Sequence, residues 1–157
     1  ADEIRTAMLS FGGVDRRFDF HVRRDDMAYI SDYAHHPEEI RQSILSIKQL
    51  YEGRRIRAIF QPHLYTRTRD FYKDFADALS LLDDVVICDI YPAREEPIPG
   101  VTSQLIYDNL RPGIQKQMCS KEDILKHVNR DEFDVLVTLG AGDIENFAHD
   151  ITNLLSC

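Results

Sequence analysis

Cysteine, basic charge and long apolar runs are all scarce in this sequence, and each scarcity argues against a class of protein. The three cysteines are scattered and none forms a CxxC pair, so a reducing, cytoplasmic setting fits best. Basic residues number 19 against 27 acidic ones, and the net charge of -8 argues against a nucleic-acid-binding surface. No apolar run approaches the ~20 residues that a membrane span needs. The sequence therefore predicts a soluble protein with neither nucleic acid nor membrane as its partner.

The rest of the composition is that of an ordinary globular domain. The 157 residues are 43% hydrophobic and 29% charged, which suffices for one domain with a real core. The sequence is still compatible with the binding of small anionic ligands, because basic residues cluster locally at Arg16-Arg17 and at Arg67 and Arg69. The chain begins with Ala1 rather than Met, so we expect it to be a piece of a longer protein.

Hydrophobic periodicity predicts an alternation of strands and helices along the chain. The expected strands cover residues 17–22, 27–32, 56–61, 85–90, 114–118 and 133–139. The expected helices cover residues 4–11, 38–50, 66–82, 103–110, 120–129 and 144–155. Such alternation predicts a Rossmann-like α/β fold, with a mostly parallel β-sheet and helices on both faces.

One expected strand-to-helix connection is unusually rich in titratable groups: Asp32-Tyr33-Ala34-His35-His36-Pro37. It stands at the carboxyl end of a strand, where open α/β sheets bind their ligands. One interpretation is a ligand site, in which Asp32 accepts from hydroxyls or holds a cation and His35 or His36 contacts an anion or transfers a proton. The other is a plain helix start, with Asp32 as the cap and both histidines in solvent.

A second polar connection is the run Phe60-Gln61-Pro62-His63-Leu64-Tyr65-Thr66-Arg67-Thr68-Arg69. Because parallel strands end at the same edge of a sheet, we expect this run beside the first. His63 and Arg67 would lie near a positive helix N-terminus, which suits recognition of a carboxylate or phosphate. The alternative is a surface helix start with an ion pair between Arg69 and Asp70.

Two weaker signals complete the pattern. The run Gly140-Ala141-Gly142-Asp143 follows a strand, and its glycines either aim backbone N–H groups at an anion or only relieve a tight turn. Arg17 follows the pair Gly12-Gly13 and is either a solvated cation or one turned toward a site shared with a preceding domain. The phosphate loop GxxxxGK[ST] is absent, so nothing in this chain cradles a nucleotide triphosphate by itself.

Together these runs resemble the C-terminal domain of the Mur ligases, and within that family the branch that adds L-alanine. Residues 32–37 are similar to the superfamily pattern Asp-Tyr-Ala-His-x-Pro, and residues 60–69 are similar to the L-alanine-adding branch. The other similar runs are 13–18, 91–101 and 140–143, in the order of the family. The resemblance implies that residues 1–14 are the tail of a central ATP-binding domain or a hinge, and that residues 15–157 are the C-terminal domain.

The resemblance also implies an activity, that of an ATP-dependent ligase in peptidoglycan precursor synthesis in the bacterial cytoplasm. ATP would phosphorylate the carboxylate of UDP-N-acetylmuramate, and the amine of L-alanine would attack the acyl phosphate. Mg²⁺ would screen the phosphates, with its ligands mainly in the missing central domain. The N-terminal and central domains of the same protein would be the partners of this one, which would fold alone without catalysing.

Roles for single residues follow from the same resemblance. Those facing ATP would be Arg17, Asp32 and Tyr33. Those lining the L-alanine and acyl-phosphate side would be His35, His63 and Arg67. Weaker matches on that side would be His36, Gly140, Gly142 and Asp143. No covalent nucleophile and no metal ligand is implied in this chain, and Leu64 stands where some members carry arginine.

Three alternatives stay open at this point. One is the tripeptide-recycling relative among the Mur ligases, which looks different around residues 60–69. Another is a metal-dependent phosphoesterase with Asp32, His35 and His36 as ligands, which borderline metals accept. The last is a non-enzymatic α/β interaction module, in which these polar groups carry no activity.

Overall fold

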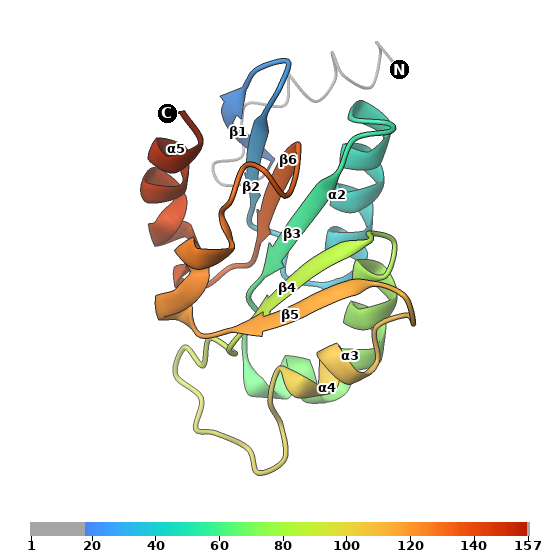
Figure 1. Ribbon diagram of the computed structural model, residues 1–157. Helices are drawn as coiled ribbons and strands as arrows, with labels where there is room; N and C mark the ends of the chain where they lie inside the picture. The colour runs from blue at the N-terminus through green and yellow to red at the C-terminus, as the bar shows by residue number, and fades with distance from the viewer. Residues whose placement is uncertain (1–17, 157) are drawn as a thin grey trace.

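A six-stranded β-sheet forms the centre of the structure, a computed structural model that describes residues 18–156 (Figure 1). In their order across the sheet, the strands are β1 (Asp19–Arg23), β2 (Ala28–Asp32), β6 (Val135–Leu139), β3 (Ile56–Phe60), β4 (Asp84–Cys88) and β5 (Gln115–Cys119). β1 pairs with β2 in antiparallel fashion, and all other neighbouring strands are parallel. The predicted mostly parallel α/β sheet is therefore confirmed.

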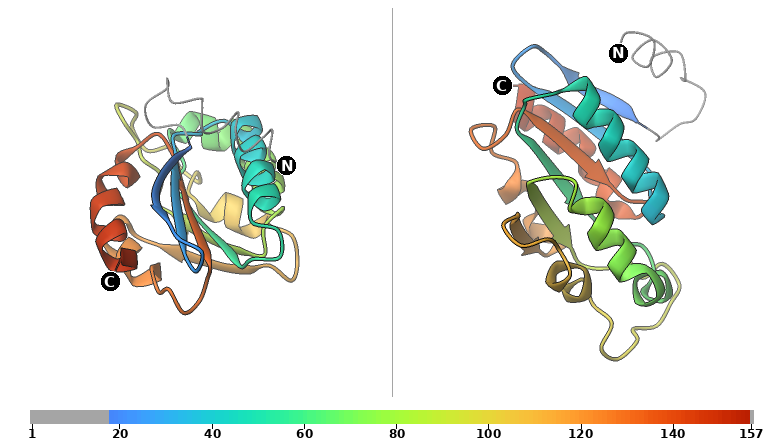
Figure 2. Two further views of the ribbon diagram at one scale, coloured as in Figure 1. Left: turned by 90° about the horizontal axis from the view of Figure 1, so that it is seen from above. Right: turned by 90° about the vertical axis from the view of Figure 1, so that its right-hand side faces the viewer.

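Helical segments cover both faces of this sheet, as the sequence pattern predicts. One face carries α2 (Pro37–Leu50), α3 (Tyr65–Leu79) and α4 (Gln104–Asp108). The other carries η1 (Lys121–His127), η2 (Asp143–Phe147) and α5 (Ala148–Ser156). Figure 2 shows α2 and α5 on opposite sides of the strands. Within residues 18–156, no helix is long and apolar enough to cross a membrane.

The strands divide the core into two layers because successive side chains point to opposite faces. In β3, Ala58 and Phe60 join the core beneath α2 and α3, while Ile59 between them joins the core beneath α5. The apolar residues Ile40, Ile44 and Ile47 form one face of α2 and are fully buried. Each such side chain contributes about 1.5–3 kcal/mol on burial, so this face fixes the start of α2 against the sheet.

Two of the expected helices differ from the structure. The segment expected as a helix at 120–129 is the 3-10 helix η1, and the final helix begins as the 3-10 helix η2 and becomes α-helical only at Ala148. Ser120 precedes η1, but its hydroxyl donates to the carboxylate of Asp123 (3.2 Å) instead of capping a backbone N–H. Over five to seven residues, apolar spacing of three and of 3.6 residues gives the same pattern, so the sequence does not separate the two helix types.

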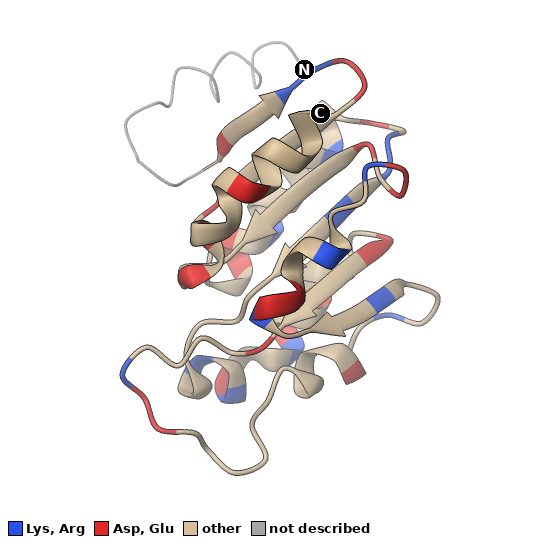
Figure 3. Cartoon of the chain, turned by 60° about the vertical axis from the view of Figure 1, so that its left-hand side comes forward, with Lys and Arg blue, Asp and Glu red and all other residues tan. Residues whose placement is uncertain are grey.

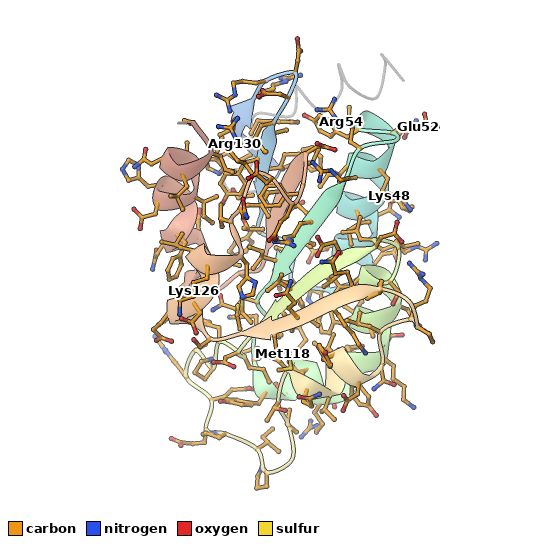
Figure 4. The ribbon with its side chains drawn as sticks, in the orientation of Figure 1. Lys48, Glu52, Arg54, Met118, Lys126 and Arg130 are labelled. Carbon is orange, nitrogen blue, oxygen red and sulfur yellow. The ribbon has the colours of Figure 1, made fainter. Side chains whose placement is uncertain are left out.

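A buried ion pair closes the edge at which the parallel strands begin. Arg57 of β3 is only 1% exposed and donates to Asp84 of β4 at 3.0 Å, to Glu132 at 2.6 Å and to the carbonyl oxygen of His127 at 2.9 Å. Burial raises the pKa of Asp84 above its usual range, although Arg57 works in the opposite direction. Arg54, labelled in Figure 4, marks this end of the molecule. The charged residues at this edge therefore pair with one another within the fold, at the opposite end of the strands from the polar connections.

Candidate functional site

Three adjacent strands end together and bring the polar connections to one edge of the sheet. Asp32 of β2 and Phe60 of β3 both pair in register with Leu139 of β6, which lies between them. The chain segments after these residues therefore leave the sheet at one level, at the lower ends of the strands in Figure 1. The expected proximity of the runs at 32–37, 60–69 and 140–143 is confirmed.

The connection after β2 enters α2 as predicted, with Pro37 at its first position. His36 precedes it as the N-cap residue, and the carboxylate of Glu39 accepts from the backbone N–H of His36 at 3.1 Å. Asp32 does not cap this helix, so that interpretation of Asp32 is wrong. Its carboxylate accepts from the N–H of Ala34 at 2.9 Å and from the hydroxyl of Ser43 in α2. Asp32 thus fixes the shape of the connection from inside the protein.

Asp32 and Tyr33 also line a small pocket between the ends of β2 and β6. The remaining residues around this pocket are Ser31, Thr138, Gly140, Ile144 and Glu145. Asp32 is 7% exposed, while Tyr33 is half-buried and its ring lies edge-on to that of His35, at 5.3 Å between centroids. Asp32 and Tyr33 therefore bring a carboxylate and a phenol to the lining of this pocket, and such groups can accept from and donate to the hydroxyls of a ligand.

A second group of side chains, the His35–His63–Arg67 cluster, lies next to this pocket. The rings of His35 and His63 are 6.0 Å apart between centroids, and the guanidinium of Arg67 donates to Nδ1 of His63 at 2.9 Å. Because arginine only donates, Nδ1 of His63 is the acceptor and its proton stays on Nε2. The tyrosine ring of Tyr91 stacks on His63 at 5.6 Å. The cluster therefore offers N–H donors from two side chains to an anion.

The backbone beneath this cluster is strained at Leu64. Its φ of 74° lies in the left-handed region, which branched side chains rarely adopt. The N–H of Leu64 donates to the carbonyl oxygen of Tyr91 at 2.9 Å, and the N–H of Tyr91 donates to that of Pro62 at 2.8 Å. These two bonds hold the strained turn in place, so His63 stands at a defined position between β3 and α3.

We predict that His63 is neutral at pH 7 and titrates below the usual histidine pKa of about 6.5. Burial lowers the pKa of His63, and electrostatic interaction with Arg67 and His35 lowers it further. Since the unfolded chain takes up this proton near pH 6.5, neutral His63 stabilises the fold fully above that pH. The contribution is lost as the pH falls toward the folded pKa. An NMR titration of the His63 ring measures this, and a value at or above 6.5 would contradict the assignment.

Gln61 is a site residue that sequence reasoning missed. It is 2% exposed, its amide nitrogen donates to Asp143 at 2.7 Å, and its amide oxygen accepts from the N–H of Ile144 at 3.0 Å. A side chain at Gly142 would place its Cβ 2.6 Å from the Gln61 amide oxygen and 2.6 Å from the ring of Tyr91. In the sequence, Gln61 is a single amide residue between Phe60 and Pro62, and this was the only signal of its role. Gln61 therefore ties the end of β3 to the turn after β6.

This packing gives the glycines of residues 140–143 a steric role. Gly140 has a φ of 147°, and a Cβ there would lie 2.8 Å from the carbonyl oxygen of Gln61. Asp143 is also paired within the chain, since Lys121 donates to it at 2.8 Å. Burial alone would raise the pKa of Asp143, but Lys121 and Gln61 together hold it below its usual value. The turn therefore supports the site through its shape.

His36 is exposed, and its ring lies 5.0 Å from that of His35 at the border of the cluster. It lines a groove between α2 and α3, together with Arg41, Phe71 and other residues. The exposed pair of Arg69 and Asp70, at 2.9 Å, confirms the alternative for those two residues alone. The expected role of Arg17 falls outside residues 18–156.

Among the described residues, one group could hold a metal ion: His35, His36 and Glu39, whose ligand atoms lie within 4.8 Å of one another. Two imidazoles and one carboxylate do not fit Mg²⁺, which prefers oxygen ligands. Arg67 is close enough to lower the pKa of His36, and a helix N-terminus is positive, so both disfavour a dication here. Asp32 is not a member of the group, which removes the carboxylate of the phosphoesterase alternative.

Comparison with known proteins decides the family. Residues 16–142 match the Mur ligase, glutamate ligase domain. The chain belongs to the Mur ligase family. The UDP-N-acetylmuramate–L-alanine ligase of Phocaeicola vulgatus is 63% identical over 155 residues, which are 99% of this chain and 34% of that protein. The chain therefore spans about a third of the curated relatives that it matches.

Solved Mur ligase structures agree in fold. The UDP-N-acetylmuramate–alanine ligase of Thermotoga maritima is 29% identical with a TM-score of 0.74, over 94% of this chain and 31% of that one. A murein peptide ligase from Psychrobacter arcticus is 24% identical with a TM-score of 0.71, over 96% and 32%. The second likeness supports the fold alone, so the tripeptide-recycling alternative gains no support from it.

Proposed function

We propose that this chain is the C-terminal domain of a UDP-N-acetylmuramate–L-alanine ligase, and that residues 1–14 connect it to a central ATP-binding domain. The observation that carries the proposal is the single sheet edge at which the Asp32 pocket and the His35–His63–Arg67 cluster lie side by side. The relative named for this activity, at 63% identity, supports it. A face with two adjacent polar sites suits a reaction that joins a phosphorylated carboxylate to an amine.

The proposed reaction makes an amide bond through an acyl phosphate. ATP transfers its terminal phosphate to the carboxylate of UDP-N-acetylmuramate, the amine of L-alanine attacks the acyl carbon, and phosphate leaves from the tetrahedral intermediate. On this chain, Arg67 donates to the carboxylate of L-alanine as a charge-assisted pair. Neutral His63 donates from Nε2 to an oxygen of the acyl phosphate or the amino acid. Both residues position the substrates and neutralise their negative charge, which raises the rate without a covalent step on this chain.

The nucleotide belongs to the neighbouring pocket in this proposal. Asp32 accepts from ribose hydroxyls of ATP, with Tyr33 beside it, and Arg17, just after the connecting residues 1–14, reaches the phosphates. Mg²⁺ is held mainly by the central domain in this proposal, because the one candidate group among residues 18–156 does not suit it, and no step here runs through it. The phosphate loop is likewise supplied by the central domain. The chain thus acts by closing over substrates that other domains hold.

Phosphate release tests the proposal directly. The full-length parent protein should release phosphate from ATP only when UDP-N-acetylmuramate and L-alanine are both present, and the isolated chain should fold without any such release. The missing phosphate loop is the reason for the second expectation. Release by the isolated chain would show that this domain does not depend on others. Phosphate release by the parent protein without L-alanine would show that L-alanine is not the required substrate.

A further inference from the structure

A loop at residues 91–102 carries a carboxylate to the start of α3. The side chain of Glu95 accepts from the backbone N–H of Thr66 at 3.1 Å and from its hydroxyl at 2.5 Å, so both carboxylate oxygens are used. Thr66 is the second residue of α3, whose first turn contains no acidic residue of its own. A helix N-terminus favours a negative charge. Glu95 therefore occupies the anion position of α3 from outside the helix.

The loop is fixed at its base, so Glu95 has a defined place beside the cluster. Tyr91 bonds to Pro62 and Leu64 through its backbone, and its ring stacks on His63. The N–H of Glu95 donates to the carbonyl oxygen of Pro92 at 2.9 Å, which closes a turn. Figure 3 shows charges of both signs on this loop, which extends below the sheet edge.

The charge of Glu95 reaches the cluster. The hydrogen bonds from Thr66 lower the pKa of Glu95, so it is negative at neutral pH. It also raises the pKa of His63 slightly against the stronger effect of burial, which means that the two groups interact electrostatically. Arg67 follows Thr66 in the first turn of α3, so an amino acid whose carboxylate lies on Arg67 would also come within the electrostatic reach of Glu95.

We propose that Glu95 is a specificity-determining residue that makes this site reject amino acids with a second carboxylate. This inference rests on the proposed function, since it concerns the amino acid held by Arg67. The place that a side-chain carboxylate would favour is the N-terminus of α3, and Glu95 already fills it. A second carboxylate would also meet the like charge of Glu95, and such repulsion is a common means of discrimination.

The test is competition by L-aspartate against L-alanine in the full-length parent protein. Glu95→Gln removes the charge but keeps an oxygen that can accept from the Thr66 N–H, and Glu96→Gln removes a neighbouring exposed charge as the matched control. For each form, the inhibition constant of L-aspartate is divided by the KM of L-alanine. We expect Glu95→Gln to lower this ratio about fivefold, as for an exposed charge pair, and Glu96→Gln to leave it unchanged.

The possible outcomes distinguish a failure of the role of Glu95 from a failure of the proposed ligase function. An equal ratio in the parent and Glu95→Gln forms, including no inhibition by L-aspartate in either, would overturn the role of Glu95. A ratio that falls as much in Glu96→Gln would also overturn it, because the effect would then be general charge. Absence of any L-alanine-dependent phosphate release in the unmodified parent would instead overturn the proposed function.

Discussion

Arg67→Ala in the full-length parent protein is expected to raise the KM for L-alanine about 100-fold and to change the KM for ATP little. The guanidinium is the partner that the substrate carboxylate would lose, and a hydrogen bond to a charged group contributes about 1.5–3 kcal/mol. The pocket at Asp32 and Tyr33, which we propose for the nucleotide, is a separate group of residues, so it should be unaffected. Initial rates with each substrate varied in turn measure both constants.

Arg69→Ala is the matched control for this variant. Arg69 lies two positions later on α3, is exposed, and pairs with Asp70 rather than with His63. It should leave both constants near those of the parent. Arg67→Ala also removes a positive neighbour of His63, so rates are compared at a pH well above the His63 pKa. An equal rise in the constants for L-alanine and ATP would reject Arg67 as the carboxylate partner.

Arg57→Met should destabilise the isolated chain by about 3–5 kcal/mol, because it leaves Asp84 without its partner at a site that is largely removed from water. Methionine keeps much of the side-chain volume, so the loss reports charge rather than a cavity. Urea unfolding, with a midpoint that falls and a slope that stays constant, measures the change.

Two further variants test whether the loss of stability in Arg57→Met comes from the buried ion pair. Arg55→Met removes an arginine that is two residues earlier, exposed, and paired with Asp134 at 3.1 Å, and it should have little effect. The double variant Arg57→Met with Asp84→Asn should recover part of the loss, because the unpaired carboxylate is gone. If Arg57→Met were no more destabilising than Arg55→Met, the buried pair would contribute nothing to the fold.

The sequence predicts much of this fold because its periodicities are local. Apolar residues at helical spacing give α2, and short, nearly continuous apolar runs give the central strands, which are buried on both faces. Since parallel strands end at one edge, the proximity of Asp32 and His63 also follows from the sequence. The position of β6 between β2 and β3 does not follow, because strand order depends on pairings between residues about 80 to 110 positions apart.

The residues of the candidate site can also be predicted from the sequence only in part. His35, His63 and Arg67 stand out because titratable residues in short connections have little reason to be there for packing. Gln61 and Glu95 do not stand out, since each acts through a partner far along the chain: Asp143 for the first and Thr66 for the second. The glycines at 140 and 142 suggested an anion cradle as readily as a tight turn, and only the positions of Gln61 and Tyr91 show the steric need.

A crystal structure of the full-length parent protein with a nonhydrolysable ATP analogue and L-alanine tests the central claim most directly. We predict that the alanine carboxylate lies within about 3.2 Å of a nitrogen of Arg67 or His63, and that the ribose of the nucleotide lies against Asp32. An alanine held entirely by residues of other domains, with Arg67 and His63 both beyond hydrogen-bond distance, would contradict the account.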